Sequence, residues 1–147
     1  AAAERLAQRC AQASGPAWTS EKLTARGVGY FPDGRSPRVM WTAVKAPSHA
    51  MDDWREALAG LIQAADLEVP TAEFHAHLTL ARFKGLRGTG LFVKMAGQFE
   101  RTVFGAWWAR EIHLMQSTLG GPEPVYTPIA TIPLAPREGA ENAARED

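Results

Sequence analysis

The strongest constraint on the fold is the alternation of side chains over residues 73–84, which read Glu-Phe-His-Ala-His-Leu-Thr-Leu-Ala-Arg-Phe-Lys. A period of two residues predicts a β-strand, because successive side chains of a strand point to opposite faces of its sheet. The polar and small side chains of one face are His75, His77, Thr79 and Ala81. The large apolar side chains of the other face, which we expect in the core, are Phe74, Leu78 and Leu80. The stretch therefore predicts a sheet whose open face carries imidazole and hydroxyl groups.

The pair His77 and Thr79 combines two groups that can act on a phosphodiester without a metal ion. Imidazole titrates near neutral pH and can act as a general acid or base. A threonine hydroxyl beside it can donate a hydrogen bond to an anionic oxygen, and the basic residues Arg82, Lys84 and Arg87 follow directly. On these residues alone, a half-solvated sheet surface without a function is an equal alternative, since His and Thr are ordinary residues on exposed strands.

Composition bounds the class of protein. The 147 residues are enough for one domain with a core, and 46% hydrophobic and 22% charged residues describe an ordinary globular protein. Sixteen basic residues balance sixteen acidic ones, so net charge favours no partner. The single Cys10 excludes an internal disulfide and a cysteine-based zinc cluster. No apolar run approaches the roughly 20 residues that span a bilayer, and no signal peptide is visible, so we expect a cytoplasmic protein with no membrane partner.

The remaining patterns predict a mixture of helices and strands. The expected helices cover residues 1–13, 48–65 (with Ser48 as N-cap) and 91–99. The expected strands cover residues 23–31, 38–45, 107–117 and 125–134, and Pro32-Asp33-Gly34 turns the first pair into a hairpin. Gly27 and Gly29 indicate a bulge or a close backbone approach, and Pro128 and Pro133 indicate an edge or irregular strand. We expect the order strand, strand, helix, strand up to residue 84 to form one lobe.

Residues 74–84, Phe-x-x-His-Leu-Thr-Leu-Ala-Arg-x-Lys, resemble the second signature of the 2H phosphoesterase superfamily, in its bacterial 2′-5′ RNA ligase / RNA 2′,3′-cyclic phosphodiesterase branch. The sequence departs from that branch at Ala76, where a proline usually precedes the histidine. Two hairpin segments, residues 27–44 and 104–126, are similar to the equivalent segments of the same family. The resemblance therefore covers most of the chain.

The resemblance implies an α+β, two-lobed 2H phosphoesterase fold, with antiparallel sheets lining a central cleft and helices packed outside. It implies a single domain over residues 1–136 that lacks its N-terminal part. The polar and charged composition of residues 137–147 separately predicts a disordered tail. The family uses two catalytic imidazoles, each at the start of a His-x-Thr motif. None of the other histidines of this chain, which are His49, His75 and His113, begins such a motif. We therefore expect a His-x-Thr in roughly 30 to 50 residues upstream of Ala1. Inactivity of this chain alone is one expected consequence.

The resemblance also implies a reaction. Water opens a terminal RNA 2′,3′-cyclic phosphate to a 2′-phosphate without metal, ATP or another cofactor, and reversible 2′-5′ RNA ligation is a second activity. His77 would transfer protons, with the general-base role favoured, and Thr79 would hold a non-bridging phosphate oxygen. The candidate substrate-binding residues are Arg82, Phe31, Arg38 and Trp41, with Tyr30 as a further stacking candidate. The implied partners are RNA ends with a cyclic phosphate or a 2′-5′ linkage, tRNA halves among them. We expect the protein to be a monomer.

Several alternatives stay open at this point. By strict alternation Arg82 points away from His77, and a solvated strand-end arginine is as good an interpretation. For the hairpin aromatics Tyr30, Phe31 and Trp41, a role in the core is the stronger interpretation. His75 and His77 on one strand face could bind zinc if Glu73 or His113 supplied a third ligand. A non-catalytic RNA- or nucleotide-binding module of the same fold is the remaining alternative.

Overall fold

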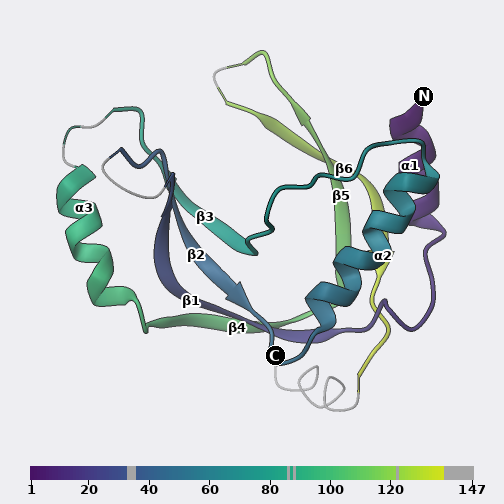
Figure 1. Cartoon of the computed structure of the whole chain (residues 1–147), viewed down its shortest axis with the longest axis horizontal. Coiled ribbons are helices and arrows are strands. Elements are labelled where there is room, and N and C mark those ends of the chain that lie inside the picture. The colour runs from purple at the N-terminus through teal and green to yellow at the C-terminus, as the bar shows by residue number, and fades with distance from the viewer. Residues whose placement is uncertain (33–35, 86, 88, 122, 138–147) are drawn as a thin grey trace. The chain divides into compact units, whose positions relative to one another are not determined.

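The computed structural model describes residues 1–32, 36–85, 87, 89–121 and 123–137. It is an α+β protein (Figure 1), so the predicted fold class is confirmed at this level. The elements are α1 (Ala2–Ala11), β1 (Glu21–Phe31), β2 (Val39–Lys45), α2 (Ala50–Ala64), β3 (His77–Arg82), α3 (Thr89–Ala96), a 3₁₀ turn η1 (Gly97–Phe99), β4 (Val103–Ala109), β5 (Glu111–Thr118) and β6 (Val125–Pro133). Most of the predicted Pro32-Asp33-Gly34 turn and residues 138–147 of the predicted tail lie outside the described residues.

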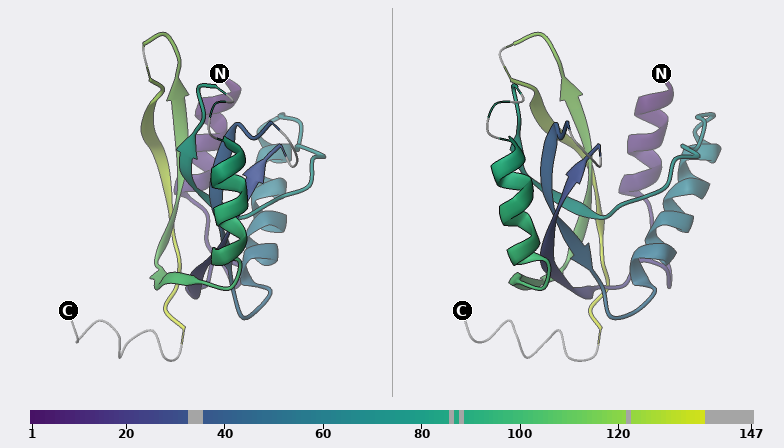
Figure 2. Two further views of the ribbon diagram at one scale, coloured as in Figure 1. Left: turned by 90° about the vertical axis from the view of Figure 1, so that its left-hand side faces the viewer. Right: turned by 60° about the vertical axis from the view of Figure 1, so that its left-hand side comes forward.

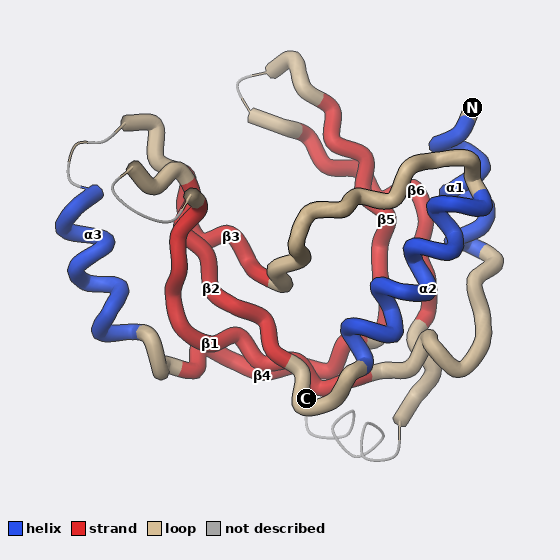
Figure 3. The backbone as a smooth tube through the Cα atoms, viewed as in Figure 1, coloured by secondary structure: helices blue, strands red, loops and turns tan. Residues whose placement is uncertain are grey.

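The described residues divide into two compact units. Unit 1 comprises Ala1–Glu21, Ser48–Thr71 and the residues from Trp108 on, and unit 2 comprises Lys22–Pro47 and Ala72–Trp107. α2 therefore belongs to unit 1, whereas the bodies of β1, β2 and β3 belong to unit 2. The predicted single lobe of strand, strand, helix and strand is wrong, because the long irregular segment between α2 and β3 (Figure 3) carries the chain from one unit to the other.

Unit 2 is built on a four-stranded sheet in the order β3-β2-β1-β4. β1 and β2 pair antiparallel from Thr24 opposite Lys45 to Phe31 opposite Val39, which confirms the predicted hairpin. Leu23 and Ala25 are buried, as their alternation in the sequence predicts. β2 in turn pairs antiparallel with β3, so three neighbouring strands come from the two segments with the clearest sequence patterns.

Both glycines that were predicted to mark a bulge or a close approach in β1 do so. The register with β2 shifts between Arg26 and Gly29, and Gly27 has a φ of 73°, a region that side chains disfavour. A Cβ at Gly29 would lie 2.3 Å from the ring of Trp41. The indole of Trp41 therefore lies directly on the backbone of β1, in space that any side chain at position 29 would fill.

β3 is shorter than predicted, and its apolar face is less buried. The strand begins at His77, so the four residues before it form a loop. The expected core residues Phe74, Leu78 and Leu80 are 51%, 45% and 48% exposed, so this prediction is wrong. Phe74 lies in the loop before the strand, and Leu80 lines a hollow beneath α3, the helix on this face of the sheet (Figure 2). The Tyr30 hydroxyl donates to the Phe92 carbonyl of α3 at 2.7 Å.

The predicted helix over residues 91–99 is present, with earlier bounds. α3 runs from Thr89 to Ala96 and changes to the 3₁₀ turn at Gly97, the residue that weakens the helical pattern. Beneath α3 the sheet leaves an apolar hollow of about 210 Å³, whose lining includes Val28, Met40 and Leu80. This face of the sheet is therefore a loosely filled hydrophobic layer.

Unit 1 contains α1, α2 and the two-stranded antiparallel sheet β5-β6. Its buried apolar side chains are Cys10, Trp18, Ala50, Trp54, Ala65, Ile132 and Leu134. Burial raises the pKa of the Cys10 thiol, so this residue acts as a packed apolar group. The ladder of β5 and β6 is irregular where Met115 pairs with Pro128, which confirms the irregular last strand predicted from its prolines.

The strand predicted over residues 107–117 is two strands. β4 ends at Ala109 and belongs to the four-stranded sheet, whereas β5 starts at Glu111 and pairs with β6. Arg110 lies at the break, where its carbonyl accepts a hydrogen bond from the Leu134 N–H at 2.9 Å. The alternation of side chains continues through Arg110, and for that reason the sequence alone does not reveal the break.

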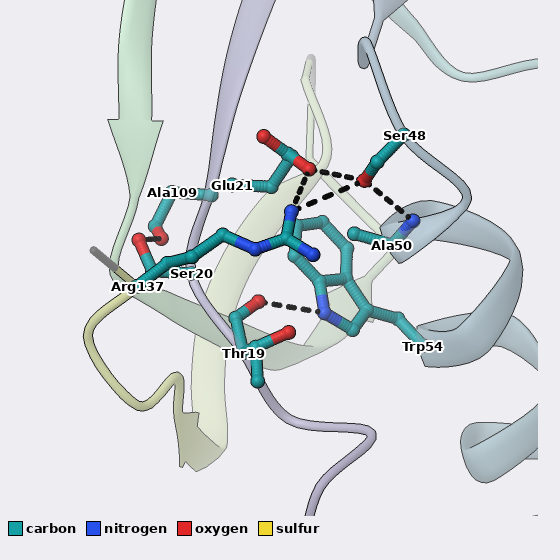
Figure 4. A network of polar contacts seen from close by, with 8 residues as sticks. All are labelled: Thr19, Ser20, Glu21, Ser48, Ala50, Trp54, Ala109 and Arg137. Carbon is teal, nitrogen blue, oxygen red and sulfur yellow. Dashed lines mark hydrogen bonds and ion pairs between the residues drawn. The ribbon is translucent and has the colours of Figure 1, made fainter. Parts of the chain in front are cut away.

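A buried polar network joins three segments of unit 1 (Figure 4). The Glu21 carboxylate, 3% exposed, lies 2.6 Å from a guanidinium nitrogen of Arg137 and accepts a hydrogen bond from Ser48. The predicted N-cap Ser48 also accepts from the Ala50 N–H, at 3.2 Å. Arg137, the first residue of the predicted tail, is thus bound to the start of β1. Within the described residues, no helix is long and apolar enough to cross a membrane.

Candidate functional site

The candidate site lies on the face of the unit 2 sheet that carries His77 and Thr79. His77 pairs with Ala43 of β2, and Thr79 pairs with Trp41. Directly paired residues of neighbouring strands lie on the same face, so both side chains share a face with the Trp41 indole. Both side chains are exposed. The alternation that predicted an imidazole and a hydroxyl side by side therefore holds from His77 to Thr79.

The imidazole of His77 is held in one orientation. Its Nδ1 lies 2.6 Å from the carbonyl oxygen of His75, and because a carbonyl can only accept, Nδ1–H is the donor. In the neutral ring the proton therefore resides on Nδ1 and Nε2 is an acceptor. The ring of Phe31 meets the imidazole edge-on, with centroids 5.1 Å apart and an interplanar angle of 84°, and the Trp41 ring lies at 6.3 Å. This arrangement can present Nε2 as a base.

His75 does not share a strand face with His77, because β3 begins only at His77. The His75 ring lies near the Phe31 ring, with centroids 5.8 Å apart, and its Nε2 is 3.7 Å from the Glu73 carboxylate. Across the residues that the structure describes, no three His, Cys, Asp or Glu side chains lie close enough together to hold a metal ion. The zinc alternative therefore lacks its ligand set there.

A bulge in β3 changes the side to which Arg82 belongs. Thr79 pairs with Trp41 and Ala81 pairs with Met40, so Leu80 has no direct partner in the ladder. After the bulge Arg82 pairs with Val39, which lies two residues from Trp41 and hence on its face of the sheet. Strict alternation predicted that Arg82 points away from His77, and that prediction is wrong. The bulge puts an exposed cation on the His77 face.

The other predicted substrate-binding residues separate into two groups. Phe31 and Trp41 lie against the His77 imidazole and against each other, with ring centroids 5.0 Å apart. Arg38 precedes β2, where its backbone bonds Phe31 and Phe83, and its side chain is exposed. Tyr30 belongs to the opposite face: its hydroxyl donates to α3, and burial raises its pKa. Tyr30 is half-buried there, on the face of the sheet away from His77.

Sequence reasoning missed Arg26, which belongs to the same face. Arg26 pairs with Ala43, and Ala43 pairs with His77, so the three residues form one row across β1, β2 and β3. The signal was available in the alternation of β1: the burial of Leu23 and Ala25 sends the even-numbered residues 22–26 to the other face. What the sequence did not contain was the register that aligns Arg26 with His77.

A second ordered imidazole belongs to unit 1. Nδ1 of His113 lies 3.0 Å from the Thr131 hydroxyl on β6, and Nε2 lies 3.0 Å from the Glu111 carboxylate. His113 was a predicted third zinc ligand, and the structure instead engages both of its ring nitrogens in hydrogen bonds within the β5-β6 sheet.

Comparison with known proteins gives a consistent set of relatives. The RNA 2′,3′-cyclic phosphodiesterase of Aeropyrum pernix is 30% identical over 105 residues, covering 71% of this chain and 60% of the relative. The protein of the same name from Archaeoglobus fulgidus is 32% identical over 108 residues, covering 71% and 57%, and that from Methanothermobacter thermautotrophicus is 29% identical over 112 residues, covering 72% and 56%. The chain thus spans less than two thirds of the length of these curated relatives. No family model matches it.

Among solved structures, the crystal structure of TT0787 of Thermus thermophilus matches with a TM-score of 0.62. The match covers 92% of this chain and 70% of that chain, at 24% sequence identity. At this identity the likeness shows a shared fold.

Proposed function

Since the chain is a distant member of the family of RNA 2′,3′-cyclic phosphodiesterases, we propose that the protein opens terminal 2′,3′-cyclic phosphates of RNA with water, leaving 2′-phosphates and using no metal ion. The observation that carries the proposal is the orientation of His77, whose Nδ1 is bound to a carbonyl so that Nε2 can accept a proton. Thr79 stands two residues away on the same face. We include in the proposal the two-lobed 2H phosphoesterase fold, as a single domain over residues 1–136.

The proposed steps follow from these groups. Nε2 of His77 takes a proton from water as the water oxygen attacks phosphorus, and the bond from phosphorus to O3′ breaks. The Thr79 hydroxyl donates to a non-bridging oxygen of the phosphorane, and Arg82 offsets its negative charge. O3′ leaves with a proton from a second general acid. The product carries its phosphate on O2′.

The same chemistry accounts for a ligase activity. When the 5′-hydroxyl of a second RNA replaces water, attack on the cyclic phosphate breaks the same bond to O3′ and yields a 2′-5′ linkage. The partners of the site are accordingly RNA ends with a cyclic phosphate or a 2′-5′ linkage, tRNA halves included. The competing function is a non-catalytic RNA-binding module, which the replacement of the family's proline by Ala76 favours.

The deciding experiment is hydrolysis of 2′,3′-cyclic nucleotides by the full-length protein that contains this chain, with and without EDTA. We expect a 2′-nucleotide product, rates unaffected by EDTA, and loss of turnover in His77→Ala. A 3′-nucleotide product or inhibition by EDTA would contradict the mechanism. Retained nucleotide binding without turnover would instead support the binding module.

A further inference from the structure

We propose that a basic hollow beside His77, formed by Arg26, Lys45 and Arg101, binds the phosphodiester backbone of the RNA strand that leads to the cyclic phosphate. This inference rests on the proposed function, because it names the substrate class of the same site as an oligonucleotide. The hollow has a volume of about 540 Å³ and lies wholly within unit 2. Its lining also includes Trp41, Ala43 and Glu100.

The hollow adjoins the catalytic candidate through the row Arg26, Ala43 and His77. Neighbouring strands lie about 4.8 Å apart, so the backbones of Arg26 and His77 are separated by two such spacings, roughly 10 Å. Ala43 stands between them, and its single methyl group leaves the space above β2 open. This separation favours contact of Arg26 with a phosphate other than the one that reacts at His77.

The side chains that line the hollow carry a net positive charge, which favours binding of the negatively charged RNA backbone. Arg26, Lys45 and Arg101 are exposed, and Glu100 is the acid among its lining residues. None of the three cations is a partner in the ion pairs found within the described residues. Cations of this kind neutralise backbone phosphates and position a strand without selecting its sequence.

Trp41 connects the hollow to the reacting end. Its ring lines the hollow and also lies 6.3 Å from the His77 imidazole, centroid to centroid. Gly29 leaves room for the ring in this place, since a side chain there would overlap it. Single-stranded RNA is commonly bound by cations that follow the backbone together with aromatic rings that meet the bases. The hollow supplies both, and it favours a strand of several nucleotides over a single one.

The test compares two substrates with the full-length protein: a tetranucleotide ending in a 2′,3′-cyclic phosphate, and the cyclic mononucleotide of the same terminal base. For each variant the readout is the ratio of kcat/KM for the tetranucleotide to kcat/KM for the mononucleotide. We expect a wild-type ratio well above one, and a decrease of about tenfold or more when Arg26→Ala is combined with Lys45→Ala. Lys94→Ala on α3, a cation outside the hollow, is the matched control and should leave the ratio unchanged.

Salt provides an independent readout. Binding of a fluorescent tetranucleotide ending in a 2′-phosphate should weaken with salt, and the double variant should reduce the log–log slope by about 1.4, or roughly 0.7 for each lost phosphate contact. An unchanged slope together with an unchanged ratio would overturn the proposal. If the wild type turns over neither substrate, the proposed function fails, while a smaller slope in the double variant would still support the hollow and an unchanged slope would reject it. Thermal unfolding of each variant identifies misfolded protein.

Discussion

His77 and His113 are two imidazoles on strands of different units, and their surroundings differ in one decisive respect. Each is exposed and accompanied by a threonine hydroxyl. Both ring nitrogens of His113 have protein partners at 3.0 Å, Thr131 and Glu111. Only Nδ1 of His77 has such a partner, the carbonyl of His75, within the described part of the chain. Similar residue types thus give a closed network in one unit and an imidazole that can still accept a proton in the other.

The difference teaches that proximity of a histidine and a hydroxyl does not by itself define a site. Both ring nitrogens of His113 are hydrogen-bonded, one to the Glu111 carboxylate and the other to the Thr131 hydroxyl. The bond to Thr131 links β5 to β6. The His75 carbonyl orients the His77 ring through Nδ1 and leaves Nε2 available to accept a proton, which is the arrangement that general-base catalysis needs. The comparison therefore predicts unequal effects of equivalent substitutions, and the following variants are assayed in the full-length protein.

The largest effect is expected for His77→Asn. Asparagine keeps a polar group of similar size and removes the basic Nε2, so kcat for cyclic nucleotide hydrolysis should decrease by roughly 10²- to 10⁴-fold. Steady-state rates under saturating substrate measure the change. A decrease in kcat of less than threefold would show that His77 is not the general base and that it does not differ from His113 in this respect.

A smaller decrease is expected for Thr79→Val, which removes a hydroxyl and keeps the shape of the side chain. Loss of one donor to a developing oxyanion commonly costs 10²- to 10³-fold, and because Thr79 is exposed we expect roughly 10- to 100-fold in kcat. The matched control is Thr131→Val, which removes the hydroxyl beside His113. Equal losses in the two variants would show that the effect is not specific to the His77 face.

Arg82→Met tests the bulge. Because the register places Arg82 on the His77 face, loss of its charge should lower kcat/KM by about tenfold, and Arg82→Lys should restore part of the loss. The same assay at two salt concentrations measures how much of the effect is electrostatic. Activity equal to wild type in Arg82→Met would mean that the arginine is solvated and only ends the strand.

The smallest effect is expected for His113→Asn. The variant loses exposed hydrogen bonds in unit 1, so kcat should stay within about twofold of wild type and the free energy of unfolding should decrease by less than about 1 kcal/mol. Urea unfolding measures the stability and the same hydrolysis assay measures kcat. A loss of activity as large as that of His77→Asn would mean that the closed network takes part in catalysis.

The sequence predicted those parts of the fold that depend on local pattern. The β1-β2 hairpin, the close approach at Gly29 and the shared face of His77 and Thr79 follow from alternation and from the properties of glycine. These features are encoded within short stretches of the chain, so an isolated segment carries enough information to reveal them.

The features that the sequence did not reveal depend on distant partners. The bulge at Leu80 exists only in the pairing of β3 with β2, and it decides the face of Arg82. The break at Arg110 involves a hydrogen bond from Leu134, which lies far along the chain at the end of β6. The exposure of Phe74 goes with the start of β3 at His77, which leaves Phe74 in the preceding loop. These features depend on strand pairing and strand ends, which a local pattern of side chains does not contain.

The group that orients the His77 imidazole belongs to the main chain. A side-chain substitution at His75 leaves its backbone carbonyl in place. Mutagenesis of side chains would therefore not detect the hydrogen bond that orients the His77 imidazole. The hydrogen bond to this carbonyl therefore does not depend on the identity of the side chain at position 75. Only a change in the path of the backbone, such as an inserted residue between the two histidines, would expose how much the site relies on that single oxygen.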